Sequence, residues 1–188
     1  MLENYHWINE PKHWKITGEN FTLQTDPKTD FWRKTHYGFI RDNGHFFFTE
    51  LFGKFEIKVK ITGEYKDLYD QAGIMIRQDE SHWLKTGIEY VHGQQQVSAV
   101  VTRDYSDWSV SPYAGNPPHI WLKLFRENEF VEIHFSSDDI HYDLLRIAYM
   151  PPSDSLMVGL MAASPDGEGF AVDFSHLEIT QDSPKDKA

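Results

Sequence analysis

Alternation of apolar and polar residues along short segments constrains the fold of this chain more than any other feature. In residues 54–63, KFEIKVKITG, an apolar side chain occupies every second position, and most positions between carry lysine or glutamate. Successive side chains of an extended strand point to opposite faces, so the pattern predicts an antiparallel strand with one buried and one solvated face. No segment shows a convincing helical periodicity.

Further segments of this kind follow one another along the chain, with turn-forming residues between them. We predict strands at 15–17, 21–25, 54–63, 71–79, 82–91, 95–103, 119–126, 130–136, 142–150, 156–164 and 171–180. Short strands with turn signals roughly every 8–12 residues are typical of an all-β sandwich or barrel. Residues 156–164 are almost wholly apolar, which predicts a strand buried on both faces.

The length fits one domain, because all-β sandwiches and barrels run to roughly 200–250 residues. We therefore expect a single domain over residues 1–180 and a flexible polar tail over 181–188. The net charge of −11 opposes binding to nucleic-acid phosphates and to anionic membrane surfaces. The sequence contains no cysteine, no secretory-signal pattern and no long apolar run. We expect a cytoplasmic protein without nucleic-acid or membrane partners.

Motifs of metal binding and covalent catalysis are missing. Ten histidines are scattered without a His-Glu-x-x-His spacing, and there is no Gly-x-Ser-x-Gly elbow or glycine-rich phosphate loop. His134 and His141 fall on neighbouring predicted strands, but two ligands do not make a metal site. We expect no metal, no cofactor and no catalytic residue.

A polar set falls on one face of three consecutive predicted strands. Trp83, Lys85 and Glu89 alternate with apolar residues of the opposite face. Sequential antiparallel pairing adds residues from the two neighbouring strands: Gln71, Arg77, Ser98 and Thr102. The segment RDYSDWS (103–109) brings Asp107 and Trp108 to a strand end. Acids, amides, bases and indoles on one sheet face are the chemistry of sugar recognition.

The same polar residues also suit the ordinary solvent face of a sheet, and residue types alone favour that reading. Two residues favour a cleft floor: Trp83 on this face, and Gly87 in mid-strand, since a strand glycine marks close approach of a ligand or backbone. Retaining glycosidases need two carboxyl groups about 5–5.5 Å apart. Glu89 has no acidic neighbour on its own strand face, although an adjacent strand could supply one.

Five segments in order resemble the DUF1349 family of the concanavalin A-like lectin/glucanase superfamily: TDFWR (29–33), DQAGIMIR (70–77), WLKTGIEY (83–90), VVTRDYSDWS (100–109) and GFAVDFSHLEI (169–179). The resemblance covers about residues 10–180. It implies a two-sheet antiparallel jelly-roll β-sandwich whose concave sheet often forms a carbohydrate cleft, lined here by 71–77, 83–91 and 96–103. Some relatives are described as regulators of enolase, which implies a role in intracellular metabolism.

The activities of the superfamily do not transfer. Its glucanases carry a Glu-x-Asp-x-x-Glu signature on one strand, whereas GIEYVHG matches only at Glu89, with Val91 where an aspartate is needed. The acidic metal-binding loop of legume-type lectins is also missing. Fold similarity alone does not license an activity.

We therefore hypothesise a non-catalytic protein that binds a small sugar, polyol or sugar phosphate in the concave face. The expected ligand-binding residues comprise hydrogen-bonding groups, cations for a phosphate or carboxylate, and stacking rings: Gln71, Glu89 and Asp107; Lys85 and Arg77; Trp83, Trp108 and Trp32. Trp32 suits the core even better. The alternatives are a protein-interaction module that regulates a metabolic enzyme and, less favoured, a glycoside hydrolase or lyase using Glu89. A closed groove would favour a small ligand, and a flat face a protein partner.

Overall fold

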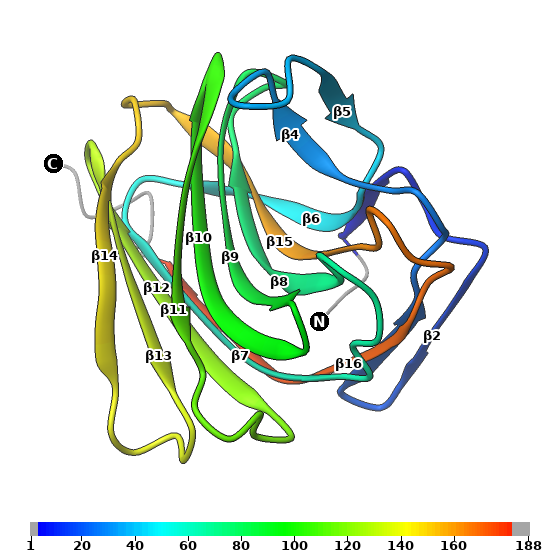
Figure 1. Cartoon of the computed structure of the whole chain (residues 1–188). Coiled ribbons are helices and arrows are strands. Elements are labelled where there is room, and N and C mark those ends of the chain that lie inside the picture. The colour runs from blue at the N-terminus through cyan, green and yellow to red at the C-terminus, as the bar shows by residue number, and fades with distance from the viewer. Residues whose placement is uncertain (1–3, 182–188) are drawn as a thin grey trace, which may run out of the picture.

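The computed structural model describes residues 4–181, and every regular element in this range is a β-strand (Figure 1). The strands in chain order are β1 (His6–Ile8), β2 (His13–Thr17), β3 (Asn20–Gln24), β4 (Phe31–Arg33), β5 (Ile40–Asp42), β6 (His45–Phe52), β7 (Phe55–Gly63), β8 (Gln71–Arg77), β9 (His82–Val91), β10 (Gln94–Arg103), β11 (Tyr105–Pro112), β12 (Ile120–Glu127), β13 (Phe130–Ser136), β14 (Asp143–Tyr149), β15 (Ser155–Ala163) and β16 (Ala171–Gln181). The described range contains no helix long and apolar enough to cross a bilayer.

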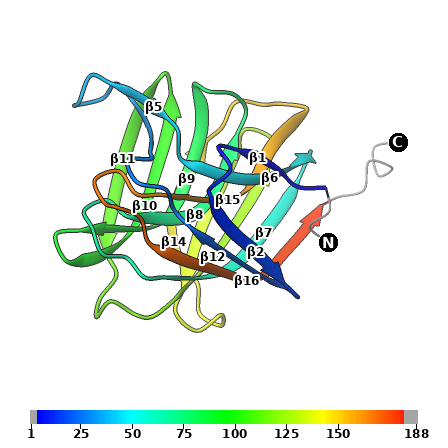
Figure 2. The same cartoon turned by 90° about the vertical axis from the view of Figure 1, so that its right-hand side faces the viewer.

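Two large antiparallel sheets form a sandwich, which Figures 1 and 2 show from two directions. The first sheet has the order β1-β6-β15-β8-β9-β10-β11, and the second has the order β14-β13-β12-β7-β16-β3-β2. Strands β4 and β5 form a separate two-stranded hairpin. The predicted all-β, two-sheet antiparallel sandwich is confirmed.

The main core lies between the two sheets, as the alternation predicts. Phe55, Ile57, Val59 and Ile61 of β7 are buried and belong to one cluster with residues of the first sheet such as Leu84. Each fully buried side chain of this size contributes about 1.5–3 kcal/mol through removal of apolar surface from water.

A second, smaller core lies on the outer face of the first sheet. Phe31 and Trp32 of β4 pack there with Phe46, Met75, Trp83, Val100 and Met161. In Figure 1 the β4–β5 hairpin lies on the concave side of the bent strands β8, β9 and β10. The first sheet is therefore covered on both faces around β15, which explains why residues 156–163 of this strand carry no polar side chain.

Several elements carry no clear alternation and were not expected from the sequence, namely β1, β4, β5, β6 and β11. The segment 103–109, expected to end a strand, instead turns at Asp104, whose φ of 61° is left-handed, and continues as edge strand β11. The residues of the predicted tail from 182 to 188 lie outside the described range, and β16 extends to Gln181.

Candidate ligand-binding cleft

The floor of the candidate site lies on the outer face of the first sheet, where three neighbouring strands meet. Gln71 of β8 pairs with Glu89 of β9, and Ser98 of β10 pairs with Gly87. A side chain at Gly87 would collide with the carbonyl oxygen of Ala72, so this glycine allows a close approach of backbone. The register places Gln71, Lys85, Glu89 and Ser98 on one face, as sequential antiparallel pairing predicts.

This face is buried, so it is not an ordinary solvent face. Lys85 is 4% exposed and Glu89 is 8% exposed. The ammonium of Lys85 donates hydrogen bonds to Gln71 Oε1 at 2.6 Å, to the Phe31 carbonyl at 2.7 Å and, more weakly, to Asp30 Oδ1 at 3.5 Å. Three acceptors therefore face the three N–H donors of Lys85, and the Asp30 carboxylate offsets part of the cost of burying its charge.

Within residues 4–181, only one of the two carboxylate oxygens of Glu89 accepts hydrogen bonds. Its Oε2 accepts hydrogen bonds from Ser98 Oγ at 2.8 Å and from Trp108 Nε1 at 2.9 Å. No donor within residues 4–181 reaches its Oε1. Burial raises the pKa of the Glu89 carboxyl; the charge of Asp30 acts in the same direction, while Lys85 and the two hydrogen bonds oppose it.

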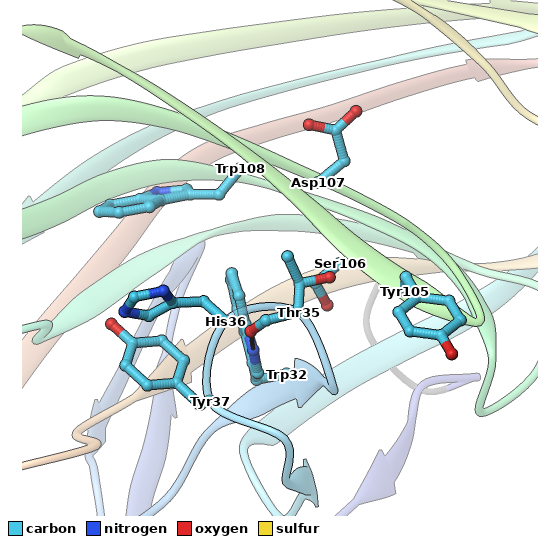
Figure 3. A pocket seen from close by; sticks show the side chains of 8 residues that line it. All are labelled: Trp32, Thr35, His36, Tyr37, Tyr105, Ser106, Asp107 and Trp108. Atoms are coloured by element: carbon cyan, nitrogen blue, oxygen red, sulfur yellow. Dashed lines mark hydrogen bonds between the residues drawn. The ribbon is translucent and has the colours of Figure 1, made fainter.

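An aromatic groove of about 610 Å³ opens beside this floor. Figure 3 shows Trp108 on one side and His36, Tyr37 and Trp32 on the other. The turn between β4 and β5 that carries Tyr37 contains three residues with left-handed φ: Lys34 at 59°, His36 at 63° and Gly38 at 74°. The volume lies in the range of roughly 300–1,000 Å³ that small-molecule sites occupy.

A chamber of about 40 Å³ lies between the groove and the floor. Four aromatic side chains enclose it: Trp32, Tyr37, Tyr69 and Trp108. Trp32 packs edge to face with Tyr37, with ring centroids 5.7 Å apart, and Tyr69 packs in the same way with Trp108, with centroids 6.3 Å apart. The hydroxyls of Tyr37 and Tyr69 lie 3.3 Å apart. Asp30, Gln71, Lys85 and Glu89 also line this chamber, so it connects the polar floor to the aromatic walls.

Six of the eight sequence-predicted site residues line the groove or the chamber: Gln71, Lys85, Glu89, Trp108, Trp32 and Asp107. Trp32 combines the two roles considered for it, because its ring belongs to the second core and also lines the groove and the chamber.

Arg77 and Trp83 lie outside the cleft, and Asp107 borders it with its carboxylate paired to another residue. The guanidinium of Arg77 makes two hydrogen bonds to the Asp42 carboxylate, at 2.6 and 2.8 Å. Trp83 is 1% exposed and lies in the second core, beside Lys85 on the outer face of the sheet. The side chain of Asp107 points away from the groove in Figure 3 and lies 3.5 Å from Arg146. Consecutive residues of a strand face opposite ways, so the carboxylate of Asp107 and the ring of Trp108 project to opposite sides of β11.

Several residues of the cleft were not among the predicted site residues, and Asp30, Tyr37 and Tyr69 are three of them. Asp30 lies within the TDFWR segment, which the sequence analysis singled out, but its pairing with Lys85 could not be seen in the sequence. Tyr37 and Tyr69 lie in connecting segments without periodicity, and only the fold brings their hydroxyls together.

The histidines do not converge. His134 contacts Glu132 at 3.2 Å, and His141 contacts Asp138 at 2.9 Å. Within the described part of the chain, no group of three or more histidine or acidic side chains is arranged to hold a metal ion.

A two-sheet sandwich with a covered cleft on the concave face of one sheet defines a β-sandwich protein of the concanavalin A-like type. More particularly, the chain belongs to the DUF1349 family, whose model, described as a protein of unknown function, matches residues 7–182. This confirms the resemblance seen in the sequence.

Known proteins similar to the chain include one close relative and several distant structures. The chain is 45% identical over 174 residues to "Regulation of enolase protein 1" of Saccharomyces cerevisiae, covering 93% of this chain and 88% of that protein. A crystal structure of a functionally unknown protein from Saccharomyces cerevisiae superposes with a TM-score of 0.92 at 44% identity, covering 97% of this chain and 98% of the other.

Two distant structures share the fold alone. Carbohydrate-binding module CBM66 from Bacillus subtilis has a TM-score of 0.60 at 15% identity, covering 95% of this chain and 96% of the module. A GH43 protein from Bacillus licheniformis has a TM-score of 0.70 at 16% identity, covering 95% of this chain but only 37% of that protein.

Proposed function

We propose that this protein binds a small sugar or polyol in the cleft and catalyses no reaction on it. The observation that carries the proposal is the buried carboxyl of Glu89, which keeps one oxygen without a donor in residues 4–181 beneath a groove walled by aromatic rings. Carboxyl and amide groups hydrogen-bond to sugar hydroxyls, and aromatic rings cover the apolar face of a sugar ring. A carbohydrate-binding module with the same fold agrees with this proposal.

The shape of the site favours a small ligand over a protein surface. The groove and the chamber share Trp32, Tyr37 and Trp108, so a ligand lying in the groove can extend one group toward Glu89. A flat face would offer no such enclosed end. The aromatic walls at Trp108 and Tyr37 provide the stacking surfaces that the sequence hypothesis assigned in part to Trp83.

The pairing of the two cations changes the expected ligand class. Arg77 is engaged by Asp42, and the three N–H donors of Lys85 are directed to groups of the protein. A ligand phosphate would meet no free cation on the floor, and it would add negative charge beside Asp30 and Glu89. We therefore propose a sugar or polyol rather than a sugar phosphate.

A thermal-shift series with neutral and amino sugars and with polyols tests the proposal. A ligand that binds only the native state raises the melting temperature with concentration, by an amount equivalent to about 2.7 kcal/mol at one hundred times the Kd. Trp108→Leu removes a groove wall and the indole donor to Glu89, so it is expected to abolish the shift.

Trp14→Leu is the matched control, because Trp14 is 39% exposed, close to the 37% of Trp108, but lies on β2 at the edge of the second sheet. This control is expected to keep the shift. No shift with any compound, or equal loss in both variants, would contradict the proposal.

A regulatory role is a second candidate, supported by the printed name of the 45% identical relative. Here the protein would contact enolase, and this would agree with the cytoplasmic location that the composition predicts. Sedimentation velocity of an equimolar mixture with enolase from the same organism is the test. A new, faster-sedimenting species would support this role. Its absence at about 10 µM of each protein would count against it, because this is about tenfold above a Kd of about 1 µM, which corresponds to a binding free energy of about −8.2 kcal/mol.

The hydrolase alternative depends on Glu89 and Asp30, the two carboxyl groups that line the chamber. Glu89 Oε2 is bound by Ser98 and Trp108, and Asp30 Oδ1 by Lys85 and the Phe31 amide. We expect no release of aryl alcohol from aryl glycosides. Release that disappears in Glu89→Gln would establish catalysis instead.

A further inference from the structure

The chamber above Glu89 is enclosed by aromatic rings on several sides. Trp32 contacts Tyr37, the hydroxyl of Tyr37 contacts that of Tyr69, and Tyr69 contacts Trp108. These four rings come from β4, the β4–β5 turn, the β7–β8 connection and β11, so the fold assembles them from distant parts of the sequence. The face of an aromatic ring carries negative electrostatic potential and attracts cations.

The polar groups of the chamber offer more acceptors than donors. Within residues 4–181, no donor reaches Glu89 Oε1 or Asp30 Oδ2. The donors of Lys85 are directed to Gln71, Phe31 and Asp30. A protonated primary amine has three donors and no acceptor, which complements this set.

The net charge and the volume of the chamber also favour a primary ammonium group. Asp30, Lys85 and Glu89 together carry one net negative charge when Glu89 is ionised, and an ammonium would balance it. The hydrogen bond with Tyr37 and burial raise the pKa of Tyr69, another group of the chamber, to about 12, so Tyr69 stays neutral. A chamber of about 40 Å³ suits an ammonium, which is similar in size to a water molecule, better than a trimethylammonium.

We propose that the chamber binds the protonated primary amine of the ligand, so that the cleft is selective for an amino sugar or amino polyol over its neutral counterpart. The body of the ligand lies in the aromatic groove, and its ammonium donates to Glu89 Oε1. This inference rests on the proposed binding of a sugar or polyol.

Isothermal titration of the full chain with matched pairs tests the inference: glucosamine and glucose, galactosamine and galactose, and glucamine and sorbitol. Hydrogen bonds to charged groups contribute about 1.5–3 kcal/mol, so each amine is expected to bind about 10- to 100-fold more tightly than its neutral partner. N-acetylglucosamine, which keeps the nitrogen but loses the charge, is expected to bind like glucose.

Glu89→Gln is expected to remove the preference, so that each amine binds no more tightly than its neutral partner. Glu132→Gln, a carboxyl-to-amide change on β13 of the second sheet, is the matched control and is expected to keep the preference. The comparison of glucosamine with N-acetylglucosamine on the unaltered chain needs no variant, so it stands even where Glu89→Gln fails to fold.

The outcomes separate this inference from the proposed function. Equal affinity for amines and neutral partners would leave sugar binding intact and overturn the selectivity for an amine. Tight binding of N-acetylglucosamine would overturn it as well. Absence of binding by every compound would overturn both the inference and the proposed function.

Discussion

The two faces of strand β9 are both buried, but by different means. Leu84 and Ile88 on the inner face belong to the main hydrophobic core between the sheets. Lys85 and Glu89 on the covered outer face instead bond to polar partners, except that Oε1 of Glu89 has no donor within residues 4–181. Apolar burial stabilises the fold directly, whereas burial of an ion pair contributes little net stability because desolvation offsets the attraction. The outer face is therefore better explained by binding than by folding.

Removal of one buried ion gives the largest expected effect. Lys85→Met would leave the Gln71 amide oxygen without this donor and the buried Asp30 carboxylate without its ammonium partner, with the Phe31 amide as the remaining close donor. Breaking a buried pair in this way is expected to lower the free energy of unfolding by about 4 kcal/mol, as measured by urea denaturation. The double variant Lys85→Met with Asp30→Asn is expected to recover part of the loss. Equal stability of the single and double variants would mean that the pair does not act as a unit.

A large-to-small change on the inner face is expected to cost slightly less. Leu84→Ala removes a fully buried side chain from the core and leaves a cavity, which corresponds to about 3 kcal/mol of lost stability. Because Leu84 points away from the cleft, the affinity of the folded protein for ligand is expected to be unchanged. A parallel loss of affinity in titrations below the melting temperature would show that the two faces are coupled.

A smaller effect on stability is expected from loss of the hydrogen bond between Trp108 and Glu89. Trp108→Phe keeps an aromatic wall but removes the Nε1–H donor to Glu89, leaving Ser98 as the donor to that oxygen. Loss of one hydrogen bond to a charged or polar buried group corresponds to about 1–2 kcal/mol in denaturant unfolding. An unchanged unfolding midpoint would indicate that the indole bond contributes nothing to the folded state.

The smallest expected effect is a difference in pH dependence. The pKa of Glu89 is raised in the folded protein, so the native state holds this proton more tightly than the unfolded chain does. Its contribution to stability is present at low pH and is lost as pH rises above the unfolded value of 4.5 and through the folded pKa. The difference in free energy of unfolding between the unaltered chain and Glu89→Gln is expected to fall with pH, by at most about 1.4 kcal/mol per unit. A rising difference would show that the folded pKa is lowered instead.

The inner face of β9 could be predicted from the sequence, because period-two alternation needs no knowledge of distant residues. The same alternation assigned Lys85 and Glu89 correctly to one side of the strand. The cover over that side could not be predicted, since β4 and β5 are short and contact residues of the sheet that follow 35 to 54 positions later, Asp42 with Arg77 and Phe31 with Lys85. As a result Trp83, expected as a stacking wall, is part of a second core.

The predictions for Trp108, Asp107 and Arg77 were correct only in part, for a related reason. Trp108 was expected at the site, but Asp107 beside it was assigned to the same site although β11 alternates them between opposite faces. Arg77 was expected to supply positive charge, yet its partner Asp42 lies on the hairpin that the sequence pattern did not reveal. Residues that contact one another locally were predicted well, and residues joined by long-range packing were not.

A map of backbone amide chemical shifts during titration with glucosamine and glucose tests the account most directly, because it locates the site without changing the protein. The account predicts perturbations concentrated at residues 30–37, 69–71, 85–89 and 105–108, which surround the cleft. Perturbations concentrated on the outer face of the second sheet around Trp121, or none with either sugar, would contradict the claim that the covered face of the first sheet is the binding site.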